Sequence, residues 1–341
     1  MKVFEIGNAE ERRWDDYVIP RTGAVTDLYA WRRVVEEAYG IGSHFFACTD
    51  DGERIVGTLG LYDIQHVIFG HYLTTAVFGN DGGFHFDNPE ARDALLSRAK
   101  RLADKLGVQY LVIRDRENAL DGFEVDRSYM TAVIDLRDGA DALWKRLPAK
   151  TRNQARRGMK EGFTVSVGHE QLDAFFDVFH QHMRDLGSPA HSHRYYEKIV
   201  EYLGDKASFI VVRDGDALAA GALLFKVNET GMNLHTVSLR KYNPRNPNYL
   251  LYWKMMEMSC ESELKWFDMG RSRGDSPQLR FKENWKPQEI ELTYNFYLRK
   301  LKAIPDIDPR NPKYRLQIAL WQKMPLAVTK AVGPRLIAGL A

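Results

Sequence analysis

The chain has 341 residues, of which 44% are hydrophobic and 12% aromatic, and its formal net charge is +2. This length favours two domains over one, and the apolar content excludes a disordered protein. The nearly neutral charge argues against a dedicated nucleic-acid coat protein, although a local basic patch stays open.

The cellular location is predicted from three features. The two cysteines, Cys48 and Cys260, are too few and too distant for a disulfide framework, which favours a reducing compartment. The N-terminal stretch carries charges where a signal peptide needs its apolar run. No apolar run reaches the ~18 residues of a membrane span. We therefore expect a cytoplasmic protein, with a peripheral place on the inner face of the membrane left open.

In the first half, a helical pattern comes first and two strands follow it. The predicted elements are a helix over 28–39, strands over 44–48 and 54–62 around an Asp-Asp-Gly turn, a helix over 89–106 and a buried strand over 108–113. Gly107 marks the end of the long helix.

The second half repeats this order. Apolar residues at helical spacing predict a helix over 172–186, which ends at Gly187, and a second helix follows around residues 196–203. The later elements are strands over 209–213, 217–227 and 232–238, a helix over 248–263, a short strand over 266–269 and a final strand over 291–298.

Two similar orders of elements predict a duplicated α/β (α+β) protein with mixed sheets, although any α/β chain can produce such an order by chance. The predicted domains are residues 1–137 and 138–300, followed by a tail over 301–341. A glycine inside the second strand of each hairpin indicates a bulge or the close approach of another backbone. This order of elements resembles the GNAT acyltransferase fold, which implies two tandem domains of that kind.

The densest basic stretch covers residues 145–160, KRLPAKTRNQARRGMK. In a helix that begins after Pro148, Arg152, Arg156 and Lys160 lie four residues apart on one face, with Asn153 beside them. Guanidinium groups match phosphate oxygens, so this stripe predicts a phosphate site on a nucleotide sugar or a tRNA end. The alternatives are a solvated helix face and non-specific RNA binding that depends steeply on salt.

The segment 267–285, FDMGRSRGDSPQLRFKENW, leaves a strand and is predicted to be a polar loop that leads to the final strand. Polar groups on a loop at the carboxyl end of a strand are typical of ligand sites. The alternative is a plain surface loop.

This segment resembles the "FDFGRS…FK.NW" signature of FemAB-like proteins, in particular the subfamily associated with exosortase (PEP-CTERM) exopolysaccharide systems. Four further segments resemble that subfamily over most of the chain: LYAWRRVVEEAYG, KTRNQARRGMKEG, DLGSPAHSHRYYEKIVEYLG and NPKYRLQIALWQKMPLAVTKAVGP. The resemblance implies two GNAT-like domains that transfer an aminoacyl or acyl group to an amine of a cell-envelope precursor, of exopolysaccharide or peptidoglycan type. A phosphate-bearing glycan or peptide precursor would be the acceptor.

The acyl donor is expected to be a co-substrate, with no bound cofactor. The coiled-coil arm of the FemAB family has no counterpart here, so the resemblance does not fix the donor. The alternatives are aminoacyl-tRNA, bound by its 3′ end, and another activated acyl group. The GNAT pyrophosphate loop, Q/R-x-x-G-x-G/A, is missing from both halves, so acyl-CoA is not supported.

The resemblance implies catalysis by Lys282, whose cation would stabilise negative charge that develops on the donor. We further predict that Asp268, at a strand end, orients or deprotonates the amine. The predicted substrate-binding residues are Arg152, Asn153, Arg156, Arg271, Ser272, Arg280, Phe281, Trp285 and His235. The alternative is that Phe281 and Trp285 are core aromatics and that His235 is a satisfied core histidine.

No metal site is predicted, because His180 and His182 point to opposite sides of a helix and His191 and His193 lie in a loop. These four are expected to be surface or loop histidines. The tail over 314–340 is basic and amphipathic, contains Trp321 and is broken by Pro325 and Pro334, which predicts contact with a membrane surface or a helix pair packed on the second domain. A catalytically inert binding subunit of a polysaccharide assembly system is the alternative to an enzyme.

Overall fold

The computed structural model describes residues 1–116, 118–306 and 310–340. The chain divides into two compact units, each discontinuous in sequence. Unit 1 comprises Met1–Met130, Ile290–Asp306 and Ala338–Ala341, and unit 2 comprises Thr131–Glu289 and Ile307–Ile337. The predicted division into 1–137, 138–300 and 301–341 stays a prediction, and residues 307–309 and 341 of its last part lie outside the described residues.

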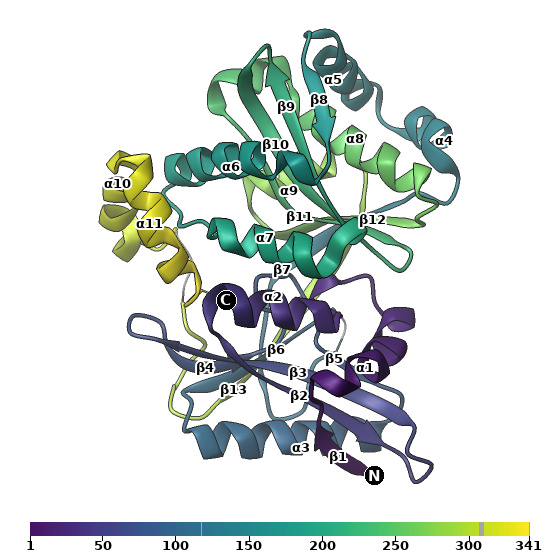
Figure 1. Cartoon of the computed structure of the whole chain (residues 1–341), viewed down its shortest axis with the longest axis vertical. Helices are drawn as coiled ribbons and strands as arrows, with labels where there is room; N and C mark the ends of the chain where they lie inside the picture. The colour runs from purple at the N-terminus through teal and green to yellow at the C-terminus, as the bar shows by residue number, and fades with distance from the viewer. Residues whose placement is uncertain (117, 307–309, 341) are drawn as a thin grey trace. The chain divides into compact units, whose positions relative to one another are not determined.

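Unit 1 is a mixed sheet with helices on both faces. Its strands lie in the order β1-β2-β3-β4-β6-β13, with β5 beside β3. Figure 1 shows α3 along one face and α1 and α2 on the other. The bounds are β1 (Lys2–Glu5), α1 (Glu11–Val18), α2 (Tyr29–Tyr39), β2 (Gly42–Thr49), β3 (Ile55–His66), β4 (Gly70–Thr74), β5 (Phe84–Phe86), α3 (Pro89–Leu106), β6 (Tyr110–Asp115) and β13 (Gln288–Leu298).

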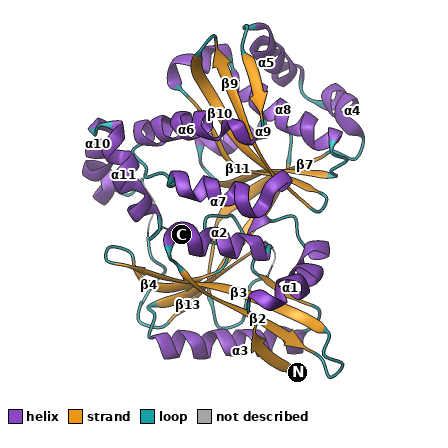
Figure 2. Cartoon of the chain, viewed as in Figure 1, coloured by secondary structure: helices purple, strands orange, loops and turns teal. Residues whose placement is uncertain are grey.

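Unit 2 has the strand order β7-β12-β11-β10-β9-β8. Helices α6 and α7 cover one face of this sheet and α8 covers the other (Figure 2). The bounds are β7 (Glu124–Asp135), α4 (Gly139–Arg146), α5 (Ala149–Lys160), β8 (Thr164–Val167), α6 (Leu172–Leu186), α7 (His193–Leu203), β9 (Ala207–Asp214), β10 (Ala217–Val227), β11 (Thr230–Ser238), α8 (Pro247–Glu261), β12 (Trp266–Arg273), α9 (Pro277–Glu283), α10 (Arg315–Lys323) and α11 (Leu326–Ile337).

The predicted repetition is confirmed. Unit 1 contains the series β2-β3-β4-α3-β6 and unit 2 contains β9-β10-β11-α8-β12. In both series the first three strands are antiparallel neighbours, and the strand after the long helix pairs in parallel with the third. The protein is therefore a mixed α/β chain built from two halves with the same order and pairing of elements.

Local sequence explains the long helix of unit 1. The Asn88 side chain accepts a hydrogen bond from the backbone N–H of Ala91 at 2.9 Å, Pro89 opens the helix, and Gly107 ends it in the left-handed conformation at φ 67°. The predicted bounds of 89–106 are confirmed.

The two strand glycines permit close approach of a helix. A Cβ at Gly57 would lie 2.9 Å from Cδ1 of Leu95 on α3, and a Cβ at Gly221 would lie 2.9 Å from Cγ1 of Val178 on α6. The register of β2 and β3 also shifts beside Gly57, between the pairs Cys48–Gly57 and Thr49–Ile55, so the predicted bulge is present there as well.

Two local predictions were wrong. The segment 270–285 is not a loop throughout, because β12 continues to Arg273 and α9 begins at Pro277, where the Ser276 side chain accepts from the N–H of Leu279. In the tail, Pro325 separates α10 from α11, but Pro334 lies inside α11. Among the described residues, no helix has both the length and the apolar character required to cross a bilayer.

Candidate active site

The central strands of unit 2 separate part of the way along their length. β11 and β12 pair in parallel from Thr230–Trp266 to Met232–Asp268, yet β11 runs on to Ser238 and β12 to Arg273. The register between β10 and β11 shifts at the same level, since Leu223 pairs with His235 whereas Leu224 pairs with Asn233. Leu234 is thus the extra residue of a β-bulge, and the bulge bends β11 where the parallel pairing stops.

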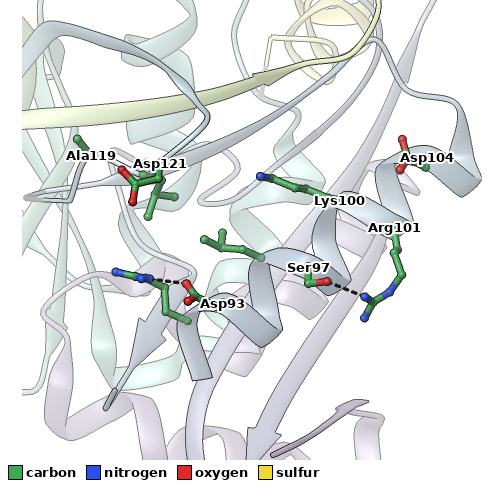
Figure 3. Close-up of a pocket in the computed structure, with 10 residues that line it drawn as sticks. Asp93, Ser97, Lys100, Arg101, Asp104, Ala119 and Asp121 are labelled. Atoms are coloured by element: carbon green, nitrogen blue, oxygen red, sulfur yellow. Dashed lines mark hydrogen bonds and ion pairs between the residues drawn. The ribbon is translucent and has the colours of Figure 1, made fainter. Parts of the chain in front are cut away.

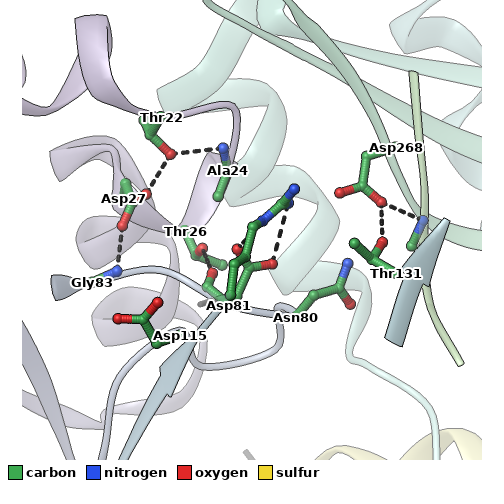
Figure 4. Close-up of polar contacts among 12 residues, drawn as sticks. Thr22, Ala24, Thr26, Asp27, Asn80, Asp81, Gly83, Asp115, Thr131 and Asp268 are labelled. Carbon is green, nitrogen blue, oxygen red and sulfur yellow. Dashed lines mark hydrogen bonds and ion pairs between the residues drawn. The ribbon is translucent and has the colours of Figure 1, made fainter. Parts of the chain in front are cut away.

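Asp268 lies at this point of separation and is fully buried. Its Oδ1 accepts a hydrogen bond from the Thr131 hydroxyl at 2.5 Å and another from the backbone N–H of Gly270 at 2.8 Å (Figure 4). Thr131 comes from β7, so two strands hold the carboxylate. Two donors on one oxygen fix its orientation and satisfy a buried negative charge.

Lys282 reaches the same turn of β12 from α9. Its Nζ donates to the carbonyl oxygen of Gly270 at 2.6 Å and to that of Arg271 at 3.2 Å. Gly270 has φ of 79°, a left-handed conformation that residues with a side chain adopt at a cost. One glycine residue therefore presents its N–H to Asp268 and its carbonyl to Lys282.

Burial lowers the pKa of Lys282 to about 8, with Asp268 acting in the opposite direction and Arg271 adding to the decrease. The side chain is only 6% exposed. With a pKa of about 8 the amine is roughly nine-tenths protonated at pH 7. A buried cation beside a fixed carboxylate is suited to stabilising an oxyanion, because water does not screen it there.

Ser272 follows on the same strand and is buried, but its Oγ has no hydrogen-bond partner within the described part of the chain. Buried hydroxyls are usually satisfied, so an unbonded one beside this turn is a natural contact for a ligand. Its predicted role in substrate binding stays a prediction.

The aromatic residues of the segment pack against α8. The Phe281 ring lies 5.0 Å from Tyr249 and 5.2 Å from Tyr252 between centroids, and Trp285 lies 5.7 Å from Tyr249. Trp285 is 1% exposed, and its indole Nε1 has no partner among the described residues. This packing holds α9, and with it Lys282, against the body of unit 2.

The basic stripe forms the helix α5 as expected, but its arginines are not unpaired cations. Arg152 donates to the carbonyl oxygens of Lys145 at 2.7 Å and Leu147 at 3.1 Å, which belong to the end of the preceding helix. The Arg156 guanidinium lies 5.4 Å from the ring centroid of Trp144. Asn153 is exposed. Both guanidinium groups thus have partners within unit 2, and binding of phosphate by this stripe stays a prediction.

The other predicted phosphate ligands, Arg271 and Arg280, are exposed on β12 and α9. Arg280 is two positions before Lys282, and Arg271 directly follows Gly270 in the turn that Lys282 contacts. Both therefore belong to the local region of the candidate site. Binding of phosphate by either arginine stays a prediction.

His235 lies on the sheet face that α6 covers, the face that Asp268 also occupies by register. Its ring is 5.0 Å from Phe179, 5.4 Å from His191 and 6.0 Å from Tyr196 between centroids. Burial lowers the pKa of His235 to about 4, and its Nε2 lacks a partner among the described residues. His235 is thus a neutral histidine within an aromatic cluster.

The prediction of a surface or loop histidine was wrong for His180, a helix residue, whereas His191 does lie in a loop. His180 is 1% exposed and donates from Nε2 to the carbonyl oxygen of His191 at 2.7 Å, and His191 is itself 3% exposed. Burial lowers the pKa of both. The helix spacing was read correctly, but the loop folds over α6 and buries both rings.

In unit 1, the place that corresponds to the separation of β11 and β12 is occupied by a loop of unit 1. There Thr74 pairs with Val112, where unit 2 pairs Met232 with Asp268. Beyond that pair, the N–H of Thr75 donates to the Val112 carbonyl at 3.2 Å and that of Gly82 donates to the Arg114 carbonyl at 3.1 Å. An apolar residue thus replaces the carboxylate, and the loop over residues 75–82 closes the space.

That loop of unit 1 is anchored by a buried ion pair. Asp27 accepts hydrogen bonds from the Thr22 hydroxyl and the Gly83 N–H (Figure 4). Its Oδ2 also lies 3.0 Å from Nε2 of His85. Burial acts against both charges, yet their attraction lowers the pKa of Asp27 and raises that of His85. Because the Asp27 carboxylate is paired with groups of unit 1 itself, the arrangement is explained as structural.

A hollow of about 520 Å³ lies on unit 1 along α3 (Figure 3). In its lining, Arg92 pairs with Asp93 at 2.8 Å and Arg101 donates to the Ser97 hydroxyl at 2.6 Å. It contains none of the predicted site residues.

Sequence reasoning missed Thr131 and the role of Gly270. Thr131 lies on β7, a strand that was not predicted and whose residues 124–130 are mostly charged or polar. The glycine after the strand end in FDMG was the available signal for a turn that exposes backbone groups.

Residues 145–286 match the family model described as "Acetyltransferase (GNAT) domain". This range covers α5 to α9 and contains Asp268, Gly270 and Lys282. A search of curated proteins found no match.

Three solved structures share the fold over most of both chains. The crystal structure of FemX has a TM-score of 0.67 at 17% identity and covers 88% of this chain and 98% of that one. The C-terminal domain (DUF2156) of a putative lysylphosphatidylglycerol synthetase from Agrobacterium fabrum has a TM-score of 0.58 at 14% identity, over 86% and 93%. A tandem GNAT protein from the clavulanic acid biosynthesis pathway has a TM-score of 0.56 at 13% identity, over 87% and 99%.

At these identities the similarity to solved structures establishes the fold. Together with the match over residues 145–286, it supports an acyltransferase of the GNAT type with a FemAB-like tandem arrangement.

Proposed function

We propose that this protein transfers an aminoacyl or acyl group from an activated ester to an amine of a cell-envelope precursor of exopolysaccharide or peptidoglycan type. The observation that carries the proposal is the Lys282–Gly270–Asp268 arrangement at the point where β11 and β12 separate. The resemblance of residues 267–285 to the exosortase-associated FemAB-like subfamily favours an exopolysaccharide precursor. The names FemX and lysylphosphatidylglycerol synthetase, given to similar structures, favour an aminoacyl group over a plain acyl group.

The reaction needs no covalent intermediate on the protein. The acceptor nitrogen attacks the ester carbonyl, a C–N bond forms as the ester C–O bond breaks, the nitrogen loses a proton, and the leaving oxygen gains one. The Lys282 ammonium would stabilise the oxyanion of the tetrahedral intermediate, and the cleft would align the two substrates.

Asp268 acts, in this proposal, mainly through Lys282. Its Oδ1 already accepts two hydrogen bonds and its side chain is fully buried, so it is a fixed negative charge. That charge raises the pKa of Lys282 against the effect of burial and so favours the protonated amine at neutral pH. The role of Asp268 as a base toward the amine stays a prediction.

A reconstitution with purified full-length protein tests the proposal and identifies the donor. The protein is incubated with a precursor fraction that bears amines and with either a mixed aminoacyl-tRNA pool or an acyl-CoA set, and the products are measured by mass spectrometry. We expect an aminoacyl mass increment from the tRNA pool and none from acyl-CoA, because neither half carries the GNAT pyrophosphate loop. No increment from either donor, with the acceptor still bound, would favour a binding subunit instead.

A further inference from the structure

The outer faces of α10 and α11 carry the same short pattern twice. Leu316, Ala319, Leu320 and Lys323 are exposed on α10, and Val328, Ala331, Val332 and Arg335 are exposed on α11. Both sets have the spacing i, i+3, i+4 and i+7, so each forms one stripe of two large apolar residues, an alanine and a terminal cation. Such a repeated stripe is not expected of a face that only meets water.

The apolar side chains of these stripes are well exposed. Leu316 is 70% exposed, Leu320 53%, Val328 43% and Val332 39%. They are four of the nine large hydrophobic residues that are exposed in the described chain, and they lie within 17 positions of each other. The concentration of exposed apolar surface on two neighbouring helices indicates a contact surface.

The opposite faces of α10 and α11 pack on the rest of unit 2, and this packing keeps the two stripes exposed. The Trp321 indole donates to the Ser188 carbonyl at 3.0 Å, the Gln322 amide donates to the Asp185 carbonyl at 3.1 Å, and Lys330 pairs with Asp177 of α6 at 2.6 Å. Figure 1 shows the two helices, in yellow, beside the end of α6. Trp321 is only 8% exposed, so of the two alternatives predicted for the tail, packing on the second domain is the one that holds for the tryptophan.

The charge of this segment indicates the chemistry of its partner. Residues 310–340 contain Arg310, Lys313, Arg315, Lys323, Lys330 and Arg335 and no Asp or Glu. Within the described chain, Arg315 and Lys323 have no acidic partner, whereas Arg310 pairs with Asp275. A surface of exposed apolar side chains bordered by cations is complementary to anionic lipid headgroups over acyl chains.

We propose that the outer face of α10 and α11 binds the surface of an anionic lipid bilayer. Leu316, Leu320, Val328 and Val332 would enter the headgroup region, and Lys323 and Arg335 would pair with lipid phosphates. The helices have 9 and 12 residues, too few to cross a bilayer, so they lie in its plane. A second copy of the chain would set one acid-free basic face against another, and their repulsion disfavours it.

Co-sedimentation of the full-length protein with vesicles tests this proposal. The vesicles contain phosphatidylcholine alone or about three parts of it to one of phosphatidylglycerol, at ~0.1 M salt. We expect binding to the anionic vesicles, weaker binding at higher salt, and little binding to phosphatidylcholine alone. Replacing Leu316, Leu320, Val328 and Val332 together by serine should lower the bound fraction at least tenfold.

Two further variants separate the contributions. Lys323→Glu with Arg335→Glu should reduce binding to anionic vesicles, because it reverses the charge at the end of each stripe. Met159→Ser removes an exposed hydrophobic residue on α5, 41% exposed, and should bind vesicles as the wild type does. Equal thermal unfolding midpoints for all variants would show that the substituted positions do not support the fold.

Several outcomes would overturn the proposal. The first is that the wild-type protein stays in the supernatant with anionic vesicles. The second is that the quadruple serine variant binds vesicles as well as the wild type. The third is that the wild type binds no vesicles but self-associates, and that the quadruple serine variant does not self-associate. The last result would identify a second copy as the partner. The proposal does not depend on the transfer reaction, because transfer to a soluble acceptor is measured without vesicles.

Discussion

Replacing Lys282 by methionine will lower the rate of group transfer by about 10²–10³-fold, the usual effect of removing one oxyanion-stabilising donor. Methionine keeps most of the side-chain length but carries no charge and no N–H. The purified variant is assayed for product by mass spectrometry, with acceptor affinity measured separately. Affinity should change by less than about threefold, because the proposal assigns Lys282 to the transition state rather than to acceptor binding.

A matched control comes from Lys286, an exposed lysine beyond the end of α9. Lys286→Met removes one positive charge from the same segment and should leave the rate within about twofold of wild type. Circular dichroism of both variants should match the wild type. A Lys282→Met protein that is folded and fully active would show that Lys282 is structural only.

The pH profile reports the state in which Lys282 acts. Burial lowers its pKa to about 8, so the ammonium form is lost as the pH rises through that value. If the cation is required, kcat/KM falls about tenfold per pH unit above pH 8. Lys282→Arg, which stays charged, should remove this fall from the profile whatever activity it retains. A rise through pH 8 would instead assign the neutral amine as a base.

Residues 1–137, made as a separate fragment, will not fold cooperatively. The last neighbour of β6 in unit 1 is β13, whose residues 293–298 pair antiparallel with 110–115 but follow unit 2 in the sequence. Asn295 of β13 is fully buried, its Oδ1 accepts from the Leu120 N–H at 2.8 Å, and its Nδ2 donates to the Asn118 carbonyl at 2.9 Å. Without β13 the fragment exposes a bare strand edge and loses these bonds.

Joining residues 288–300 to that fragment through a flexible Gly/Ser linker should restore a cooperative thermal transition, measured by circular dichroism. A linker of the same length with a scrambled 288–300 segment serves as the control. Cooperative unfolding of the unmodified 1–137 fragment would show that the predicted boundary at residue 137 delimits an autonomous domain.

Elements with strong local signals were predictable from the sequence. The helix over 89–106 has an Asn cap, a first-turn proline and a terminal glycine, and α6 has a continuous apolar stripe that ends at Gly187, so both were placed correctly. The hairpin of β9 and β10 was placed by its Asp-Gly-Asp turn. These features depend on neighbours within a few positions, which the sequence displays directly.

Features that depend on distant partners were not predictable. Asp268 was chosen as a site residue, but its hydrogen bond with Thr131 joins residues 137 positions apart and follows from strand order. His180 was expected at the surface because nothing local shows that the His191 loop folds over it. The partners of Arg152 and Arg156 were not predicted, because main-chain carbonyls and an aromatic face carry no formal charge.

The most direct test of transfer through Lys282 compares envelope glycans and their precursors extracted from three kinds of cells. The cells contain the wild-type protein, no protein, or the Lys282→Met variant. Intact-mass and fragment analysis of these extracts is the measurement. The account predicts one defined aminoacyl or acyl mass on an amine that is present with the wild-type protein and absent in the other two. Identical masses in all three, for both exopolysaccharide and peptidoglycan precursors, would contradict a transferase that works through Lys282.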